Sequence, residues 1–216
     1  MDHLAGWIGP GHSMVELRAE AERTLRHLGV EAFWYWGVGA FVFSGRETVA
    51  SVPGKAYRTP DAVVREDDIV TIDLSPRIGD VWGDFARTLV LENGTVLEDP
   101  ARSGNPGWAG GIAAERELHA ELLGLARPDM TFEELHAEMN RRIEAKGFEN
   151  LDFLGNVGHS IERRSADRIY IERGNGAPLG SVECFTFEPH LRRPGGEYGF
   201  KHENIYFFVG DELREL

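Results

Sequence analysis

Five residues that are spread along the chain have the side-chain types of a hydrolytic metal site. They are four carboxylates and one histidine: Asp73, Asp84, His159, Glu188 and Glu203. The carboxylates lie in apolar, strand-like runs, where Asp and Glu are disfavoured and where burial of an unpaired carboxylate is costly. A single case could lie on the wet face of a sheet. Four cases, together with a histidine that follows a glycine, predict a shared countercharge, which two divalent metal ions would supply.

The donor types indicate which metals and which reaction such a site would serve. Four carboxylates with one imidazole form an oxygen-dominated set, which suits Mn, Co, Fe or Zn better than copper. The four negative charges balance two divalent ions. A water that bridges two such ions loses a proton near neutral pH and becomes a nucleophile, while the ions polarise a carbonyl oxygen. Amide hydrolysis is the reaction that this set predicts.

The first two carboxylates, Asp73 and Asp84, are expected on one hairpin. The segment 68–91 has the pattern of two strands joined by a tight turn. If Ile78 and Gly79 form a two-residue loop, Asp73 lies directly opposite Asp84, on the same face and with Cβ atoms about 5 Å apart. Two like charges so placed repel each other, which predicts a metal ion between them.

Helices and further strands are expected to position these residues. Two capping boxes, at 13–16 and at 131–134, predict the starts of two amphipathic helices. Another helix is expected at 112–125, after a mobile glycine-rich loop at 103–111. The C-terminal part returns to strands, so the fold class is α+β.

Composition bounds the organisation and the partners. No repeat or linker divides the chain, so residues 1–216 are predicted to form a single domain. The net charge of −13 argues against nucleic acid and anionic membranes as main partners. No apolar run is long enough for a membrane span and no signal peptide is visible, so a cytoplasmic protein is expected. Cys184 is the single cysteine, which excludes an intrachain disulfide and a cysteine zinc site.

The five residues and their surroundings resemble the pita-bread metallopeptidases of the M24 type, the family of methionine aminopeptidase, aminopeptidase P and prolidase. The resemblance covers the chain from about residue 12 to its end. It rests on the hairpin pair Asp73 and Asp84, on Gly158-His159, on Phe187-Glu188-Pro189, on Glu203 in a terminal strand, and on the helix start at 126–135.

This resemblance implies a pita-bread fold, in which helices cover a curved antiparallel sheet. It also implies roles for the five residues. His159 and Glu188 would ligate one metal ion, Asp73 would ligate the other, and Asp84 and Glu203 would bridge the two. Glu188 would also handle the proton of the attacking water. The chain would be a bare catalytic domain, without an N-terminal domain of the prolidase sort.

The residues that handle substrate in this family differ here. The family's Gly-His-Gly-Ile-Gly loop is Gly158-His-Ser-Ile-Glu162 in this chain, and Ala166 stands where a second histidine contacts substrate. A further histidine is missing from the stretch 55–57, and the terminal Arg-x-Glu-Asp is replaced by Lys201-His-Glu-Asn204. Because such histidines orient the scissile amide and stabilise its oxyanion, their absence predicts an altered substrate pocket.

Three residues are candidates to replace the missing substrate histidines. His190 lies two positions after Glu188, on the same side of an extended chain. His202 is next to Glu203, and alternation points it to the other side. Tyr57 is able to donate a hydrogen bond where the upstream histidine is absent, with loop packing as the alternative.

Three functions follow as hypotheses. The leading one is a dinuclear metal-dependent hydrolase of the aminopeptidase or Xaa-Pro dipeptidase type that acts on a short peptide or a small amide. The second keeps the metals, with manganese among the candidates, for the chemistry of a specialised non-peptide metabolite. The third is a catalytically silent peptide-binding module, which retention of all five ligands argues against. A homodimer is left open, because the aromatic residues at 34–43 suit either a core or a dimer face.

Overall fold

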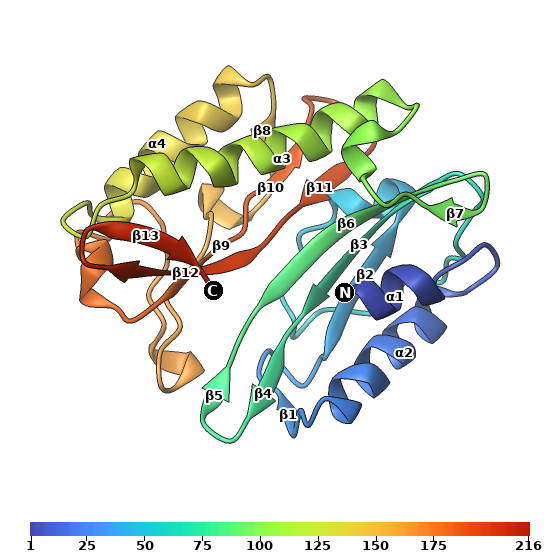
Figure 1. Cartoon of the computed structure of the whole chain (residues 1–216), viewed down its shortest axis with the longest axis horizontal. Coiled ribbons are helices and arrows are strands. Elements are labelled where there is room, and N and C mark those ends of the chain that lie inside the picture. Colours follow the sequence, from blue (N-terminus) through green and yellow to red (C-terminus); the bar gives the residue numbers. More distant parts are fainter.

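Curved layers of antiparallel strands, covered by helices, form the protein in the computed structural model, which describes residues 1–216 (Figure 1). The helices are α1 (Asp2–Trp7), α2 (Met14–His27), α3 (Pro106–Leu125) and α4 (Phe132–Ala145). The strands are β1 (Ala32–Phe33), β2 (Ala40–Ser44), β3 (Asp68–Leu74), β4 (Pro76–Ile78), β5 (Val81–Trp82), β6 (Phe85–Glu92), β7 (Thr95–Val96), β8 (Glu149–Asn150), β9 (Phe185–Phe187), β10 (His190–Arg192), β11 (Gly199–Lys201), β12 (Asn204–Val209) and β13 (Glu212–Glu215). The expected α+β class is confirmed.

Helix α2 covers the N-terminal sheet, whose strand order is β2-β3-β6-β7. The capping box predicted at its start is present: the Ser13 hydroxyl accepts a hydrogen bond from the Glu16 amide, and the Glu16 carboxylate accepts one from the Ser13 amide. Leu17, Ala21 and Leu25 recur four residues apart and are buried in a core of 15 residues shared with the strands. The apolar stripe of the helix therefore fixes it against this sheet.

Helices α3 and α4 cover the C-terminal strands, which pair in the orders β13-β12-β9 and β11-β10-β8 (Figure 1). The second predicted capping box is also present, with Thr131 at the N-cap of α4. Leu118 and Leu122 of α3 meet Leu135 and Met139 of α4 in the larger core, which contains 22 buried residues. The protein thus has two hydrophobic cores, and the larger one also includes Ile69 of β3 and Val90 of β6.

The prediction of a mobile loop at 103–111 is wrong, because most of this segment forms the first turns of α3. The Asn105 side chain caps the helix by accepting hydrogen bonds from the amides of residues 107 and 108. Trp108 is buried in the core, 7% exposed. Gly111 packs so closely on the Phe200 ring that a Cβ atom would lie 2.3 Å from it. Gly111 thus allows close packing of the helix, which outweighs its low helix propensity.

The hairpin register also differs from the prediction. The two-residue loop is Gly79–Asp80 instead of Ile78–Gly79, and Asp73 pairs with Ala86. Asp84 is therefore diagonal to Asp73 and not directly opposite it. The register has moved by two residues, and because side chains alternate with a period of two, both carboxylates still lie on one face of the hairpin.

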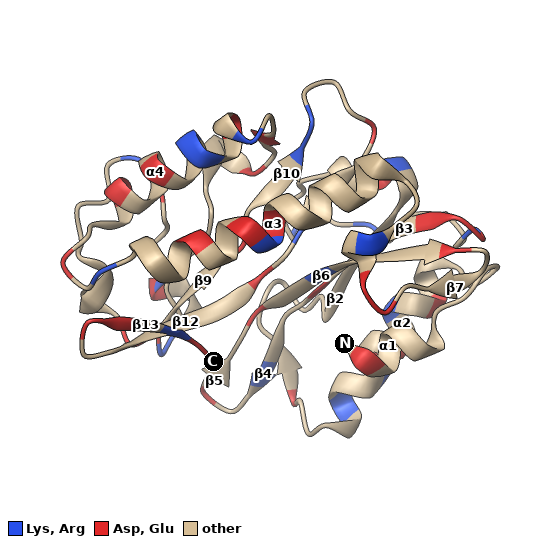
Figure 2. Ribbon diagram, turned by 45° about the horizontal axis from the view of Figure 1, so that its top comes forward, with Lys and Arg blue, Asp and Glu red and all other residues tan.

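Charged residues are frequent along α3 and α4 (Figure 2). Arg142 of α4 lies 3.0 Å from Glu121 of α3, and Lys146 lies 2.8 Å from the same carboxylate. Such half-exposed pairs at the surface contribute little to stability, about 0–1 kcal/mol each. None of the helices combines the length and the apolar character that a membrane crossing requires.

Helix α3 also carries a carboxyl group inside the protein. Glu115 is 1% exposed and neither of its oxygens has a hydrogen-bond partner. Burial raises its pKa well above the ordinary value of 4.5, although the charge of Lys201 opposes this. The folded state therefore binds a proton that the unfolded chain releases, so this group lowers stability increasingly as the pH rises above about 4.5.

We expect Glu115→Met to raise the free energy of unfolding by about 1–3 kcal/mol at pH 8, because an apolar side chain of similar shape removes the unpaired group. The gain should shrink towards pH 4. Urea denaturation over this pH range measures it. Glu117→Met, at an exposed position of the same helix, is the control and should change stability by less than about 0.5 kcal/mol. A loss of stability in the Glu115 variant at pH 8 would contradict the expectation.

Candidate metal centre

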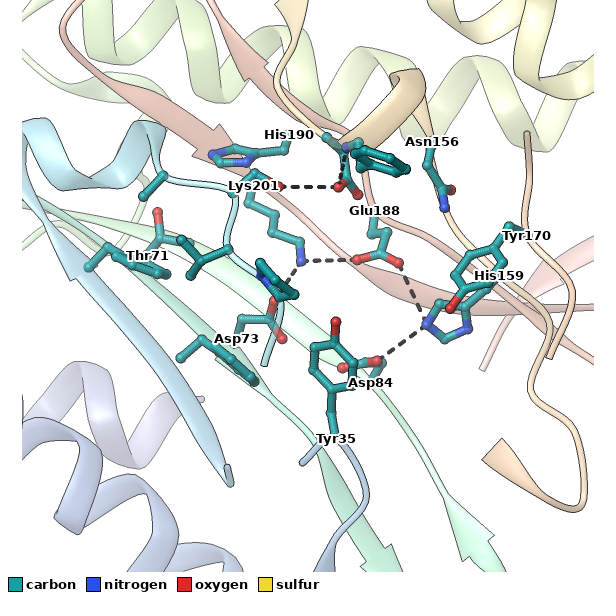
Figure 3. Close-up of a pocket in the computed structure, with 18 of the residues that line it drawn as sticks. Tyr35, Thr71, Asp73, Asp84, Asn156, His159, Tyr170, Glu188, His190 and Lys201 are labelled. Atoms are coloured by element: carbon teal, nitrogen blue, oxygen red, sulfur yellow. Dashed lines mark hydrogen bonds and ion pairs between the residues drawn. The ribbon is translucent and has the colours of Figure 1, made fainter. Parts of the chain in front are cut away.

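A cavity of about 660 Å³ lies between the two halves of the sheet layer. Four of the five residues singled out from the sequence are among those that line it: Asp73, Asp84, His159 and Glu188 (Figure 3). Glu203, the fifth, is fully buried next to them, with 0% exposure. The structure thus brings together residues that are far apart in the sequence, since Asp73 and Glu203 are separated by 130 positions.

Strand ends and breaks place these side chains. Asp73 is near the end of β3 and Asp84 directly precedes β6, while Glu188 directly follows β9. Glu203 lies in the break between β11 and β12. Its amide donates to the carbonyl of Ala86 on β6 at 3.0 Å, an isolated bridge that joins the C-terminal strands to the N-terminal sheet. The site therefore forms only when both halves are folded against each other.

His159 presents one ring nitrogen to the carboxylates. Its Nδ1 lies 3.0 Å from the Ser160 carbonyl, and because a carbonyl only accepts, Nδ1 carries the proton and donates it. Nε2 faces Asp84 at 3.5 Å and Glu188 at 3.7 Å (Figure 3). Loss of the Nε2 proton would give the tautomer in which Nε2 is free for a metal ion, the usual arrangement of a ligating histidine.

Three of the side chains approach closely enough to share one ion. One donor atom each from Asp84, His159 and Glu203 lies within 4.8 Å of the others, and all three residues are buried. Neither oxygen of Glu203 has a hydrogen-bond partner. A buried carboxylate with no partner carries a large penalty unless a cation or a proton neutralises it. The donor set and the orphaned Glu203 oxygens therefore fit a divalent cation.

The pKa values follow from this crowding of acids. Burial raises the pKa of Glu203 well above its ordinary value, and the charges of Asp84 and Glu188 add to the effect. Burial, together with the charges of Asp73 and Glu188, raises the pKa of Asp84 to about 7, against the influence of His159. Without added positive charge, the cluster holds protons at neutral pH.

Lys201, at the end of β11, supplies part of the positive charge. Its Nζ lies 2.5 Å from Asp73 and 2.9 Å from Glu188, between the two carboxylates (Figure 3). Burial alone would raise the pKa of Glu188, but the charges of Lys201 and His159 lower it overall, so Glu188 stays ionised. The sequence showed Lys201 only as a replacement for an arginine. Lys201 is two residues before Glu203, and side chains two positions apart in an extended chain point to the same side. This spacing was the sequence signal that Lys201 lies beside the carboxylate of Glu203.

The three residues considered as substrate contacts have different places. His190 lines the cavity, and its Nε2 donates to the Thr48 carbonyl at 2.7 Å. Tyr57 is instead a core residue, 4% exposed, whose hydroxyl hydrogen-bonds the backbone of Val42. The ring of His202 packs at a tilt against His119 with centroids 4.3 Å apart, away from the cavity, as alternation indicated. Burial lowers the pKa of His190 to about 4, so its ring is neutral near pH 7.

The cavity-lining residues that were not singled out from the sequence include Trp34, Tyr35, Arg168 and Tyr170. The rings of Trp34 and Tyr170 contact the His159 ring edge-on, with centroid distances of 5.7 Å and 6.0 Å. Arg168 lies two residues beyond Ala166, in the loop after the histidine. No motif marks it, because its place depends on how this loop folds back over the aromatic residues.

Comparison with known proteins agrees with the geometry. The model of metallopeptidase family M24 matches residues 1–208. Methionine aminopeptidase B of Synechocystis sp. is 25% identical over 208 residues, which are 93% of this chain and 72% of that protein. Methionine aminopeptidase A of the same organism is 27% identical over 197 residues, 88% of this chain and 72% of its own length.

Solved structures show the same fold. The prolidase from Pyrococcus furiosus superimposes with a TM-score of 0.78 at 19% identity, over 98% of this chain and 57% of that one. The methionine aminopeptidase from Thermotoga maritima gives a TM-score of 0.74 at 17% identity, over 99% of this chain and 89% of its own. The chain thus spans little more than half the length of the prolidase.

Proposed function

Because this chain belongs to metallopeptidase family M24 and has its pita-bread fold, it is a metallopeptidase-like hydrolase, and we propose that it cleaves an amide bond of short peptides. The observation that carries the proposal is the buried group of Asp84, His159 and Glu203, in which both Glu203 oxygens lack a partner. The reaction type is that of an aminopeptidase or an Xaa-Pro dipeptidase.

The finer proposal is a centre for two divalent ions, Mn, Co, Fe or Zn. His159 and Glu188 would hold one ion, Asp73 the other, and Asp84 and Glu203 both. Two ions, one hydroxide and the Lys201 ammonium would together neutralise the four carboxylates, which supports this number. When bound, such ions supply Lewis-acid activation of a water molecule and of the amide carbonyl.

The chain's own residues supply the proton chemistry and the shape of the site. Glu188 is ionised and lies at the cavity wall, so its carboxylate would accept the proton of the attacking water and pass it to the leaving amine. Lys201 holds that carboxylate through its 2.9 Å contact. His190, neutral and hydrogen-bonded through Nε2, would present its ring to the substrate as a fixed wall residue. The aromatic lining would reduce the access of water to the reacting amide.

Metal analysis and turnover of the protein purified without chelator test this function together. We expect close to two transition-metal ions per chain and hydrolysis of short peptides, Xaa-Pro dipeptides among them, in an assay that follows the released amine. Treatment with a chelator should abolish turnover, and Mn²⁺ should restore it. A protein that contains no metal and takes up neither Mn²⁺ nor Co²⁺ would refute the proposal.

Manganese as the natural ion, a cytoplasmic location, the single-domain organisation and a homodimer stay predictions. None of them is needed for the argument from the site.

A further inference from the structure

One carboxylate of the cavity wall, that of Asp152, is not among the proposed metal ligands. We propose that Asp152 binds the charged end of a basic side chain of the substrate, so that the enzyme prefers short peptides with a lysine or an arginine next to the cleaved amide. This inference rests on the proposed function, because it names the substrate class of the same site. It is carried by the place of Asp152, its hydrogen bonds, the charge of the wall and the apolar surface beside it.

Backbone hydrogen bonds hold Asp152 close to the segment that carries Glu188. Strand β8 pairs with β10, and the amide of Leu151 continues this pairing by donating to the His190 carbonyl at 2.7 Å. Further along the same loop, the carbonyl of Val157 accepts from the amide of Glu188 at 2.9 Å. The loop that contains Asp152 is thus tied at both ends to the segment of Glu188. Asp152 therefore lines the cavity near the carboxylate that would accept the proton.

One oxygen of the Asp152 carboxylate is open to a ligand. Its Oδ1 accepts hydrogen bonds from the Ser51 hydroxyl at 3.2 Å and from the Phe153 amide at 2.6 Å. Both bonds end on this oxygen, and no lysine, arginine or histidine nitrogen lies within the 4.0 Å of an ion pair. Burial and the charge of Glu188 raise the pKa of Asp152. A cation bound at Oδ2 would oppose both effects, because an opposite charge favours the ionised carboxylate.

The remaining charge of the wall also favours a cationic ligand. Lys201 already pairs with two of the proposed metal ligands. Apart from these groups, the charged residues of the lining are Asp152, Glu172 and Arg168. The guanidinium of Arg168 lies against a ring, with its central carbon 4.9 Å from the centroid of Trp34. The two carboxylates outnumber it, and a cleft with an excess of one sign of charge attracts ligands of the other sign.

Apolar residues beside Asp152 fit the stem of a basic side chain. The bond from Ser51 to Asp152 brings the chain around Ser51 close to the carboxylate. Its neighbours Ala50 and Val52 line the cavity, and so does Phe153. Lysine and arginine pack their methylene stems on such a surface while their charged ends reach a polar partner. An α-ammonium group has no stem, so the combination indicates a basic side chain instead of the N-terminus of the substrate.

Binding of matched ligands tests the proposal without turnover. The probes are analogues of Lys-Ala and Ala-Lys in which a methylene-amine replaces the scissile amide. Each is compared with its norleucine counterpart, which keeps the stem and lacks the ammonium. Isothermal titration calorimetry measures their affinity for the Mn²⁺-loaded protein. In at least one of the two positions, we expect lysine to bind at least about tenfold more tightly than norleucine, the effect of one charge-assisted contact.

Three variants separate cation binding from a purely structural role. Asp152→Asn keeps an oxygen that accepts from Ser51 and from the Phe153 amide, and it should bind the lysine and norleucine probes with equal affinity. Asp152→Glu, which keeps the charge, should retain part of the preference. Asp167→Asn is the control and should retain all of it, since Asp167 is exposed and pairs with Arg164 outside the cavity. In turnover, Asp152→Asn should lower kcat/KM for the lysine dipeptide about tenfold relative to the norleucine dipeptide.

The inference fails if wild type binds the lysine and norleucine probes equally in both positions, if no probe binds, or if the preference survives in Asp152→Asn. These results are distinct from a failure of the proposed function. A protein that shows the Asp152-dependent preference but hydrolyses no peptide would refute the peptidase proposal and leave the cation site standing. A protein that hydrolyses lysine and norleucine dipeptides with equal kcat/KM would do the opposite.

Discussion

Glu188→Gln is expected to lower kcat for the best peptide substrate by about 10²–10⁴-fold, the usual contribution of a group that transfers a proton in the transition state. The carboxylate of Glu188 lies 2.9 Å from Lys201 and 3.7 Å from His159, at the wall of the cavity. Glutamine has the same shape but cannot accept the proton. Steady-state kinetics at saturating Mn²⁺ measure the loss, and metal analysis of the same sample shows how much of the ion is retained.

Glu183→Gln is the matched control for this substitution. Glu183 is an exposed glutamate of the same segment, five residues earlier. Its substitution removes the same charge, but from the surface. Its kcat should equal that of wild type. A Glu188→Gln protein that keeps its metal and more than about a tenth of its activity would show that another group transfers the proton.

Lys201→Met is expected to destabilise the metal-free protein and to raise its affinity for a divalent metal ion. Lys201 lies between Asp73 and Glu188, and its side chain is only 15% exposed. Removal of one partner from a buried ion pair costs about 3–5 kcal/mol, because the remaining charges lose their compensation. The same removal frees Asp73, for which the ammonium and a divalent ion compete, so the affinity for Mn²⁺ should rise by about tenfold or more.

Two measurements on the same samples check this expectation. Urea denaturation in the presence of a chelator should give a lower free energy of unfolding for Lys201→Met than for wild type. Added Mn²⁺ should recover more stability in the variant than in wild type, since binding to the folded state stabilises it. Lys201→Arg keeps the charge and should behave like wild type in both respects. An unchanged Mn²⁺ affinity in Lys201→Met would show that the ammonium does not compete with the ion.

The sequence was sufficient to predict features that depend on neighbouring residues. Both capping boxes formed as expected, because their hydrogen bonds join groups three residues apart. The placement of Asp73 and Asp84 on one face also held, although the register was wrong. That conclusion depended only on the alternation of side chains, which a shift of two residues leaves unchanged. The family was recognisable for a related reason, since its motifs are short and each is read within one segment.

Features that depend on contacts between distant segments were decided by the tertiary structure. Tyr57 belongs to the core because its hydroxyl meets the backbone of Val42, and the glycine-rich segment became helix because Gly111 allows α3 to approach Phe200. Lys201 reaches Asp73 across 128 positions of sequence, and Arg168 meets Trp34 only after its loop folds back. By itself, the sequence determined which acids, which imidazole and which helix starts exist. Long-range packing alone decided which side chains face them, because no local pattern encodes the distance between two halves of a folded sheet.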